Sequence, residues 1–170
     1  MTKFVLIRGA SAVGKTTISK KILKTLKVDH KIDCAYICED DFRKQMQFKY
    51  KAKDMAAHEN SVVLIKTIIQ KLMAIDNYQI IFIEGQFRYK NILEKYKKFF
   101  EENNFEYKIF QLSLDLEIMK KRDLKHRNSK SEDIEEVKKD IEKYIPKECK
   151  IIETKKSVEE TVDEIISILL

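Results

Sequence analysis

Five short and almost wholly apolar segments are spread along the chain, and a segment with helical periodicity follows each of them. The apolar segments cover residues 4–8, 34–38, 79–83, 107–114 and 149–153. An apolar run without polar alternation predicts a strand buried on both faces, as strands are in parallel sheets covered by helices. The sequence therefore predicts an α/β fold of three layers, with a five-stranded parallel sheet in the middle.

The intervening segments place their apolar residues on one side of a helix. Ile18, Ile22 and Leu26 are spaced four apart and form one stripe that a helix would bury. Ser157, with Glu160 three residues later, has the spacing of a capping box and starts a last helix. Residues 42–51 read as helical or irregular, and the other helices are expected at 15–26, 56–75, 91–103, 115–127 and 132–145. The length of the chain, with no linker or repeat, predicts one domain over residues 1–170.

Net charge and hydropathy limit the kinds of partner and the cell compartment that we expect for this protein. A net charge of +6 and a pI near 9.0 suit a polyanionic partner such as a nucleotide or nucleic acid. No apolar run approaches the roughly 18 residues that a membrane span needs, and the N-terminus does not read as a signal peptide. Cys34, Cys38 and Cys149 are expected to be free thiols in a reducing cytoplasm. We therefore expect a cytoplasmic protein with no membrane partner, and the sequence leaves the oligomeric state open.

Arginine is scarce, because only five of the 34 basic residues are arginines. Lysine can serve for surface charge, whereas a planar bidentate contact needs arginine. The positions of the arginines are therefore expected to be informative. Arg8, just before a glycine loop, is expected to brace the end of a strand, and the others are Arg43, Arg88, Arg122 and Arg127.

The loop after the first strand matches the phosphate-binding pattern G-x-x-x-x-G-K-[ST] in full, between a predicted strand and a predicted helix. Backbone N–H groups of such a loop wrap a phosphate, and the helix N-terminus behind it favours negative charge. Lys15 is expected to reach the β and γ phosphates of ATP, and the Thr16 hydroxyl to bind Mg²⁺. The predicted nucleotide-binding residues are Gly9, Ala10, Ser11, Ala12, Val13, Gly14, Lys15, Thr16 and Thr17.

Two classes of nucleotide-binding protein fit the chain poorly. A GTPase would need N-K-x-D and D-x-x-G, and neither occurs in the sequence. A large motor or AAA-type ATPase normally has a bigger domain and an apolar strand that ends in Asp. Here the third strand ends in Glu84, followed by Gly85, the last of only three glycines. Gly85 is expected at the same ligand-binding edge as the other two.

An acidic group follows the second predicted strand, in the segment I-C-E-D-D-F-R. The carboxyl ends of parallel strands form the edge where ligands bind, so Asp40 and Asp41 should face the phosphate loop. A carboxylate there can take a proton from an attacking hydroxyl, and Arg43 can hold an acceptor phosphate or neutralise the acids. The alternative is that these acids only start a helix. His58 is either exposed or lines the acceptor site.

The glycine loop together with D-D-F-R resembles the P-loop kinases related to phage polynucleotide 5′-kinase, a group that includes zeta-type toxins, gluconate-type sugar kinases and antibiotic phosphotransferases. The resemblance implies the strand order 2-3-1-4-5. It also implies that Asp40 is the general base and that Arg43 contacts the acceptor, with Asp41 beside it. F-I-E-G-Q-F-R is similar to the group's third strand and loop, which points to Glu84 and Arg88 as acceptor-binding residues, although Glu84 could instead serve the water shell of the magnesium ion.

The segment M-K-K-R-D-L-K-H-R-N-S-K resembles the lid of these kinases, whose arginines close over the triphosphate. The resemblance implies that Arg122 or Arg127 stabilises the transition state, within a mobile lid at 115–131. The alternative is ordinary solvated charge on an exposed helix.

Together these features predict an ATP- and Mg²⁺-dependent phosphotransferase that moves the γ-phosphoryl group to a hydroxyl acceptor. A polynucleotide 5′-hydroxyl or a related small molecule is the first expectation for the acceptor. A nucleoside monophosphate kinase or a sugar or antibiotic kinase is the alternative within enzymes, and a non-catalytic ATP-binding switch is the alternative outside them.

Overall fold

The computed structural model describes residues 2–45, 55–75, 77–127, 134–155 and 157–170. Its centre is one five-stranded, fully parallel sheet in the order β2-β3-β1-β4-β5. Both the fold class and the strand order predicted from the sequence are confirmed. The strands are β1 (Lys3–Arg8), β2 (Cys34–Cys38), β3 (Ile80–Gly85), β4 (Glu106–Ser113) and β5 (Cys149–Glu153).

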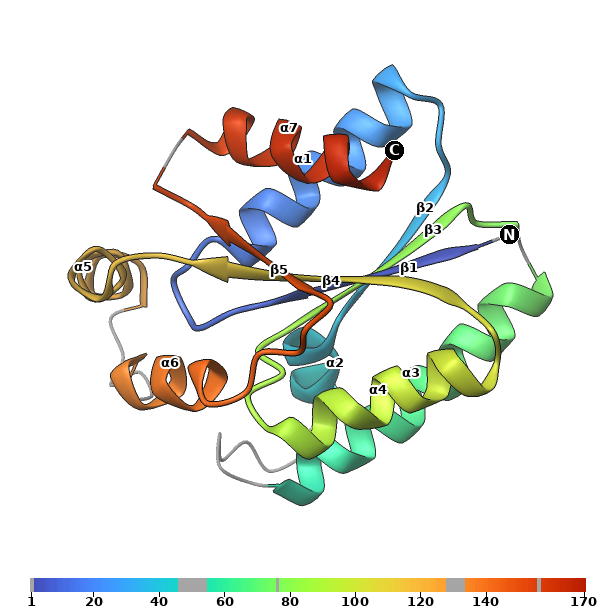
Figure 1. Cartoon of the computed structure of the whole chain (residues 1–170), viewed down its shortest axis with the longest axis horizontal. Coiled ribbons are helices and arrows are strands. Elements are labelled where there is room, and N and C mark those ends of the chain that lie inside the picture. The colour runs from blue at the N-terminus through green and yellow to red at the C-terminus, as the bar shows by residue number, and fades with distance from the viewer. Residues whose placement is uncertain (1, 46–54, 76, 128–133, 156) are drawn as a thin grey trace.

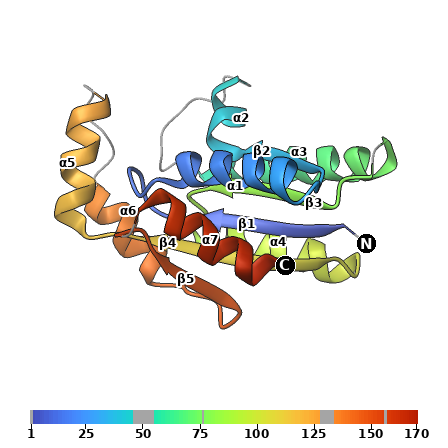
Figure 2. The same cartoon turned by 90° about the horizontal axis from the view of Figure 1, so that it is seen from above.

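Helices cover both faces of the sheet, which gives the three layers (Figure 1). On one face lie α1 (Lys15–Asp29) and α7 (Val158–Leu169), and on the other lie α3 (Met55–Ile75) and α4 (Lys90–Glu102). At the end of the sheet where the strands finish, α5 (Leu116–Arg127) and α6 (Ile134–Glu142) stand beyond the strands (Figure 2). The loop between β1 and α1 opens at this same end. Ser157 and Glu160 form the expected capping box at the start of α7.

Successive side chains of the central strand β1 point alternately into two separate hydrophobic cores. Val5 and Ile7 pack into the core under α1 and α7, whereas Phe4 and Leu6 pack into the core with α3 and α4. All four side chains are fully buried. Because successive side chains of a strand point to opposite faces, an apolar strand of this kind requires cover on both sides. Within the described residues, no helix combines the length and the apolar character that a membrane span requires.

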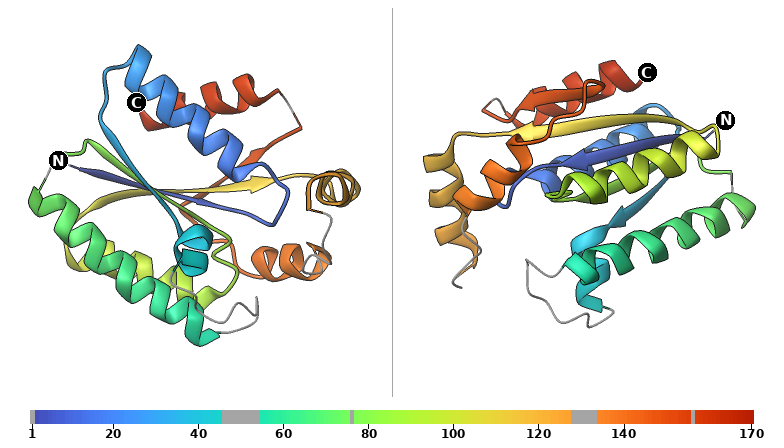
Figure 3. Two further views of the ribbon diagram at one scale, coloured as in Figure 1. Left: turned by 180° about the vertical axis from the view of Figure 1, so that it is seen from behind. Right: turned by 60° about the horizontal axis from the view of Figure 1, so that its bottom comes forward.

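The acidic residues after β2 begin a helix, which is the alternative that the sequence left open for them. The short helix α2 (Glu39–Gln45) starts directly after β2, before the segment expected at 42–51, so the acidic residues occupy its first turn. Figure 3 shows α2 at the end of β2, next to α3. Acidic side chains are stabilised at a helix N-terminus by the helix dipole, which explains the early start. The rest of the segment expected at 42–51 lies outside the described residues.

Gly85, at the end of β3, leaves room for a neighbouring side chain. A Cβ atom built on it would lie 2.6 Å from Oε2 of Glu39, 3.1 Å from the ring of Phe87 and 3.2 Å from Cβ of Glu39. Glu39 is fully buried, so its side chain cannot move out into solvent without opening the packing. The glycine therefore makes room for a buried carboxylate under the ligand-binding edge.

We predict that Gly85→Ala destabilises the fold by about 1–3 kcal/mol, the usual cost of overpacking a closed site. Urea denaturation measures the change in the free energy of unfolding. In a Glu39→Ala background the same substitution should cost less, because its clash partner is gone. Equal costs in both backgrounds would contradict the proposed steric role of Gly85.

Candidate active site

The phosphate loop has the backbone that its glycines allow. Gly14 caps α1 in the left-handed conformation, with φ 101° and ψ 12°, and Gly9 has φ 155°. A Cβ atom on Gly9 would also lie 2.9 Å from the carbonyl oxygen of Leu112. Both positions therefore favour glycine for a local reason. The resulting loop turns from the end of β1 into the N-terminus of α1, which is the arrangement that binds phosphate.

Lys15 lies over this loop. Its Nζ atom donates hydrogen bonds to the carbonyl oxygens of Gly9, at 2.9 Å, and Ala10, at 3.0 Å. The side chain is 8% exposed, so the ammonium group is held at the loop rather than extended into solvent. This places a positive charge where the sequence predicts the β and γ phosphates.

Thr16 is tied to the end of β3. Its hydroxyl donates a 2.7 Å hydrogen bond to Oε1 of Glu84, and the hydroxyl of Tyr36 donates to the other carboxylate oxygen, Oε2. Glu84 is 3% exposed. The structure thus places Glu84 against the phosphate loop, on the side of its predicted metal ligand rather than beside Arg88. A hydroxyl and a carboxylate are hard oxygen groups, so these residues fit Mg²⁺ bound together with the phosphates of a nucleotide.

Asp40 and Arg43 form an ion pair within α2. Nη2 of Arg43 donates to Oδ1 of Asp40, and Nη1 lies 2.8 Å from a ring nitrogen of His58. The Arg43 side chain is 3% exposed, whereas that of Asp40 is 23% exposed. Arg43 therefore contacts Asp40 from the protein interior, and part of the Asp40 side chain stays exposed to solvent. His58 is not on the surface, because only 1% of it is exposed.

The charge state of Asp40 reflects two opposing effects. Burial raises the pKa of its carboxyl, but the charges of Lys15 and Arg43, with the hydrogen bond from Arg43, outweigh burial and lower the pKa below its ordinary value. Asp40 is therefore ionised at neutral pH. Asp40 follows β2 at the carboxyl edge of the parallel sheet, the same edge at which the phosphate loop leaves β1.

Glu39 is a part of this region that sequence reasoning missed. It is fully buried, and Oε1 lies 3.5 Å from Nδ1 of His58. Among the described residues, neither carboxylate oxygen has a hydrogen-bond partner. Nothing in the acidic segment of the sequence distinguishes Glu39, the fully buried residue, from its acidic neighbours. The one related sequence feature is Gly85, because the side chain that it lacks would occupy the position of the Glu39 carboxylate.

Arg88 has protein partners of its own. It forms ion pairs with Asp140, at 2.6 Å, and Glu136, at 2.8 Å, both on α6, and its side chain is 2% exposed. These bonds link the loop after β3 to α6. Arg8 is likewise internal and donates to main-chain oxygens of Phe87, Ile141 and Tyr144, which agrees with the bracing role expected of it.

Arg122 of α5 lies near the phosphate loop. Nη1 of Arg122 is 4.0 Å from the position that a Cβ atom on Gly14 would take. Arg127 ends α5, and its side chain lies outside the described residues, as do residues 128–131 of the expected lid. Asp41 is 60% exposed and pairs with Lys44 at 3.5 Å, away from the buried pair.

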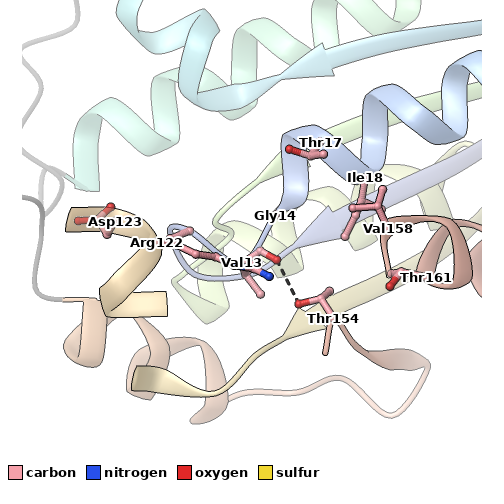
Figure 4. A pocket seen from close by; sticks show the side chains of 10 residues that line it. Val13, Gly14, Thr17, Ile18, Arg122, Asp123, Thr154, Val158 and Thr161 are labelled. Carbon is pink, nitrogen blue, oxygen red and sulfur yellow. Dashed lines mark hydrogen bonds between the residues drawn. The ribbon is translucent and has the colours of Figure 1, made fainter. Parts of the chain in front are cut away.

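A cavity of about 370 Å³ adjoins the phosphate loop on the side of α5 and α7 (Figure 4). Thr154, after β5, closes it at one side, and its hydroxyl lies within hydrogen-bond distance of the carbonyl oxygens of Val13, at 3.2 Å, and Ser113, at 3.1 Å. Sequence reasoning missed this wall, because it comes from the far end of the chain. The cavity is lined by Ala12, Val13, Gly14, Thr17, Ile18, Arg122, Asp123, Thr154, Val158 and Thr161.

Comparison with protein families gives one match, to a family described as an AAA domain (AAA_33), over residues 4–145. The chain belongs to this AAA domain family. The match covers the phosphate loop, α2, the end of β3 and α5. The expectation from the sequence that an AAA-type ATPase fits this chain poorly is therefore corrected, because the matching family is described as an AAA domain. A search of curated proteins with the sequence of this chain finds no match.

Solved structures share the fold of this AAA domain at low sequence identity. The APS kinase CysC of Mycobacterium tuberculosis, in complex with AMPPNP and APS, has a TM-score of 0.75 at 14% identity, over 99% of this chain and 97% of that one. A gluconokinase of Sinorhizobium meliloti 1021 has a TM-score of 0.65 at 11% identity, over 97% and 90%. A sugar kinase of Janibacter sp. HTCC2649 has 0.70 at 15%, over 99% and 95%. The AAA domain therefore has a P-loop kinase-like fold.

The depressed pKa of Asp40 predicts a specific pH dependence of stability. A carboxyl whose pKa is lowered by folding stabilises the protein above its unfolded pKa, about 3.9, and loses that contribution as the pH falls through the folded value. The wild-type protein should therefore exceed Asp40→Asn in unfolding free energy at neutral pH, and this excess should shrink below about pH 4. Urea denaturation between neutral and acidic pH measures it.

Asp163→Asn, at an exposed position of α7, is the matched control for loss of a carboxylate. An excess for wild type over Asp40→Asn that stays constant down to acidic pH would contradict the interaction of Asp40 with Lys15 and Arg43.

Proposed function

We propose that this protein transfers the γ-phosphoryl group of ATP to a hydroxyl acceptor. The observation that carries the proposal is the placement of Asp40: a partly exposed carboxylate directly after β2, at the same sheet edge as the phosphate loop, and fixed by Arg43. A protein that only bound and released a nucleotide would gain nothing from a carboxylate aimed at its phosphates. A phosphotransferase needs one to orient and deprotonate the attacking hydroxyl.

In the proposed reaction, side chains and backbone groups around the phosphate loop bind the negative charge of the phosphates and receive the proton of the acceptor. Backbone N–H groups of the loop and Lys15 would hold the β and γ phosphates, and the Thr16 hydroxyl, oriented by Glu84, would bind Mg²⁺, which would neutralise charge on those phosphates. The acceptor oxygen forms a bond to the γ phosphorus while the bond from that phosphorus to the β–γ bridging oxygen breaks. Asp40 receives the hydroxyl proton, and ADP leaves. Arg122 neutralises charge beside the loop.

The cavity beside Gly14 is the proposed site of the nucleoside of ATP. It joins the loop directly, and its walls combine apolar side chains such as Ile18 and Val158 with the hydroxyls of Thr17 and Thr161. A mostly apolar cavity with a few polar groups is the usual setting for a nucleotide base. Arg122 lines the same cavity, so a nucleoside there would bring the phosphates between Arg122 and Lys15.

The two arginines that were expected to bind the acceptor already have protein partners, and this changes the expected acceptor. Arg43 and Arg88 were the expected anchors for a phosphate of the acceptor, but they bind Asp40 and His58, and Asp140 and Glu136, respectively. The solved structures of this fold are named as kinases of APS, gluconate and sugar. Both observations favour a small hydroxyl-bearing molecule. A polynucleotide 5′-hydroxyl is the second candidate, supported by the net charge of +6.

We predict that the purified protein consumes Mg²⁺·ATP faster with one class of acceptor in a panel of sugars, nucleosides, nucleoside monophosphates and 5′-hydroxyl oligonucleotides. Lys15→Ala should lower the stimulated rate by about 10²–10³, because charge stabilisation at the transferring phosphoryl group is lost. Lys20→Ala, on the exposed side of the same helix, is the control. Nucleotide binding without stimulation by any acceptor would favour a switch module over a kinase.

Asp40→Asn should reduce the acceptor-stimulated rate by about 10²–10⁴, while the affinity for a non-hydrolysable ATP analogue changes little, because the group serves the acceptor rather than the nucleotide. Product formation and calorimetric binding of AMPPNP measure the two quantities separately. An unchanged rate in Asp40→Asn would refute the general-base role, and it would favour a nucleoside monophosphate kinase, whose acceptor is already an anion.

A further inference from the structure

Glu84 is held at both of its oxygens by hydroxyl groups from two other elements. Oε1 accepts from Thr16 at the start of α1, and Oε2 accepts from Tyr36 in β2. Glu84 is 3% exposed, whereas Tyr36 is half-buried. The carboxylate is therefore fixed between the phosphate loop and the neighbouring edge strand.

The sheet register explains how Tyr36 reaches this acid. Tyr36 pairs with Phe82, and Cys38 pairs with Glu84, in the parallel ladder between β2 and β3. Residues two apart in a strand share a face, so Tyr36 lies on the same face as Glu84, two residue pairs earlier in the ladder. The length of the tyrosine side chain spans that offset, and its hydroxyl arrives at the carboxylate.

The direction of the Thr16 proton decides what its oxygen can do. A hydroxyl has one proton and two lone pairs. Because Thr16 gives its proton to Glu84, the lone pairs of Oγ1 are available to a cation. A glutamate has one more rotatable side-chain bond than an aspartate, so its carboxylate needs a second contact to stay in one orientation. The bond from Tyr36 supplies that contact.

We propose that Tyr36 is a positioning residue for the magnesium-bound nucleotide: it fixes Glu84, and Glu84 orients the Thr16 hydroxyl toward the cation. The inference rests on the proposed function, since it presupposes a Mg²⁺·nucleotide at the loop. In this proposal Tyr36 acts through its hydrogen bond to Glu84 and not by direct contact with the nucleotide. A purely structural tie between β2 and β3 is the competing interpretation, and it predicts a change in stability alone.

Calorimetric titration with AMPPNP, in Mg²⁺ and in EDTA, separates these interpretations. Tyr36→Phe should weaken AMPPNP binding in Mg²⁺ by about 10-fold, the lower end for groups that orient a metal ligand, and leave binding in EDTA unchanged. Tyr107→Phe is the matched control. Its hydroxyl donates to Glu101 at 2.9 Å, at the start of β4 and the opposite end of the sheet from the loop. It should match wild type in both conditions.

A double substitution tests whether Tyr36 acts through Glu84. In a Glu84→Ala background, Tyr36→Phe should cause no further loss of Mg²⁺-dependent binding, because its partner is absent. Thermal unfolding of each variant without nucleotide checks the fold. If a variant does not fold, Glu84→Gln replaces Glu84→Ala, and Tyr36→Phe should still lose less in that background than alone.

The outcomes distinguish this inference from the proposed function. If wild-type protein binds AMPPNP no better with Mg²⁺ than with EDTA, the proposed function loses its cofactor and the role of Tyr36 falls with it. If Mg²⁺ strengthens binding in wild type and equally in Tyr36→Phe, the inference alone is overturned. An equal loss in Mg²⁺ and EDTA, or an additive effect with Glu84→Ala, would also overturn it.

Discussion

The central position of β1 is the constraint on which the site depends. Its residues from Phe4 to Ile7 are fully buried, and it pairs in parallel with β3 on one side and β4 on the other. The connections from β1 therefore leave the sheet at the point where the strand order reverses. In open parallel sheets this is where the carboxyl ends leave a crevice for a ligand. The phosphate loop, Glu84 and the helix after β4 all take their places from that geometry.

Ionisable side chains below the crevice keep their positions through mutual contacts rather than through solvent. Asp40 lies over Arg43, Arg43 meets His58, and His58 faces Glu39. Charges in such a setting interact more strongly than on the surface, and removing one partner leaves the other uncompensated. The orientation of Asp40 is thus a property of α2, α3 and the end of β3 together. This is how a carboxylate on a short helix can be held for chemistry.

The sequence predicted what depends on local pattern and missed what depends on distant contacts. The apolar runs predicted all five strands, the resemblance to P-loop kinases implied their order, and the glycine loop was visible because its backbone demands particular residues. Tyr36 and Thr154 gave no such signal, since their partners Glu84 and Val13 are far away in the chain. Only folding brings each pair together.

The arginines show that the scarcity of a residue type does not by itself reveal which partner each residue binds. A planar fork suits phosphate, but it suits carboxylates and main-chain oxygens equally well. Arg8 and Arg88 use it inside the protein, and Arg43 uses it to fix Asp40. Of the arginines whose side chains the structure describes, Arg122 is the one that lies at the cavity beside the loop.

The contact between Gly85 and Glu39 also has an evolutionary meaning. The space that a side chain at position 85 would need is taken by the Glu39 carboxylate. A descendant of this sequence would acquire alanine or serine at position 85 at a lower cost in stability once position 39 had become smaller, and a reversion at position 39 would then carry that cost again. Two positions far apart in the chain are thus coupled in the substitutions that they tolerate.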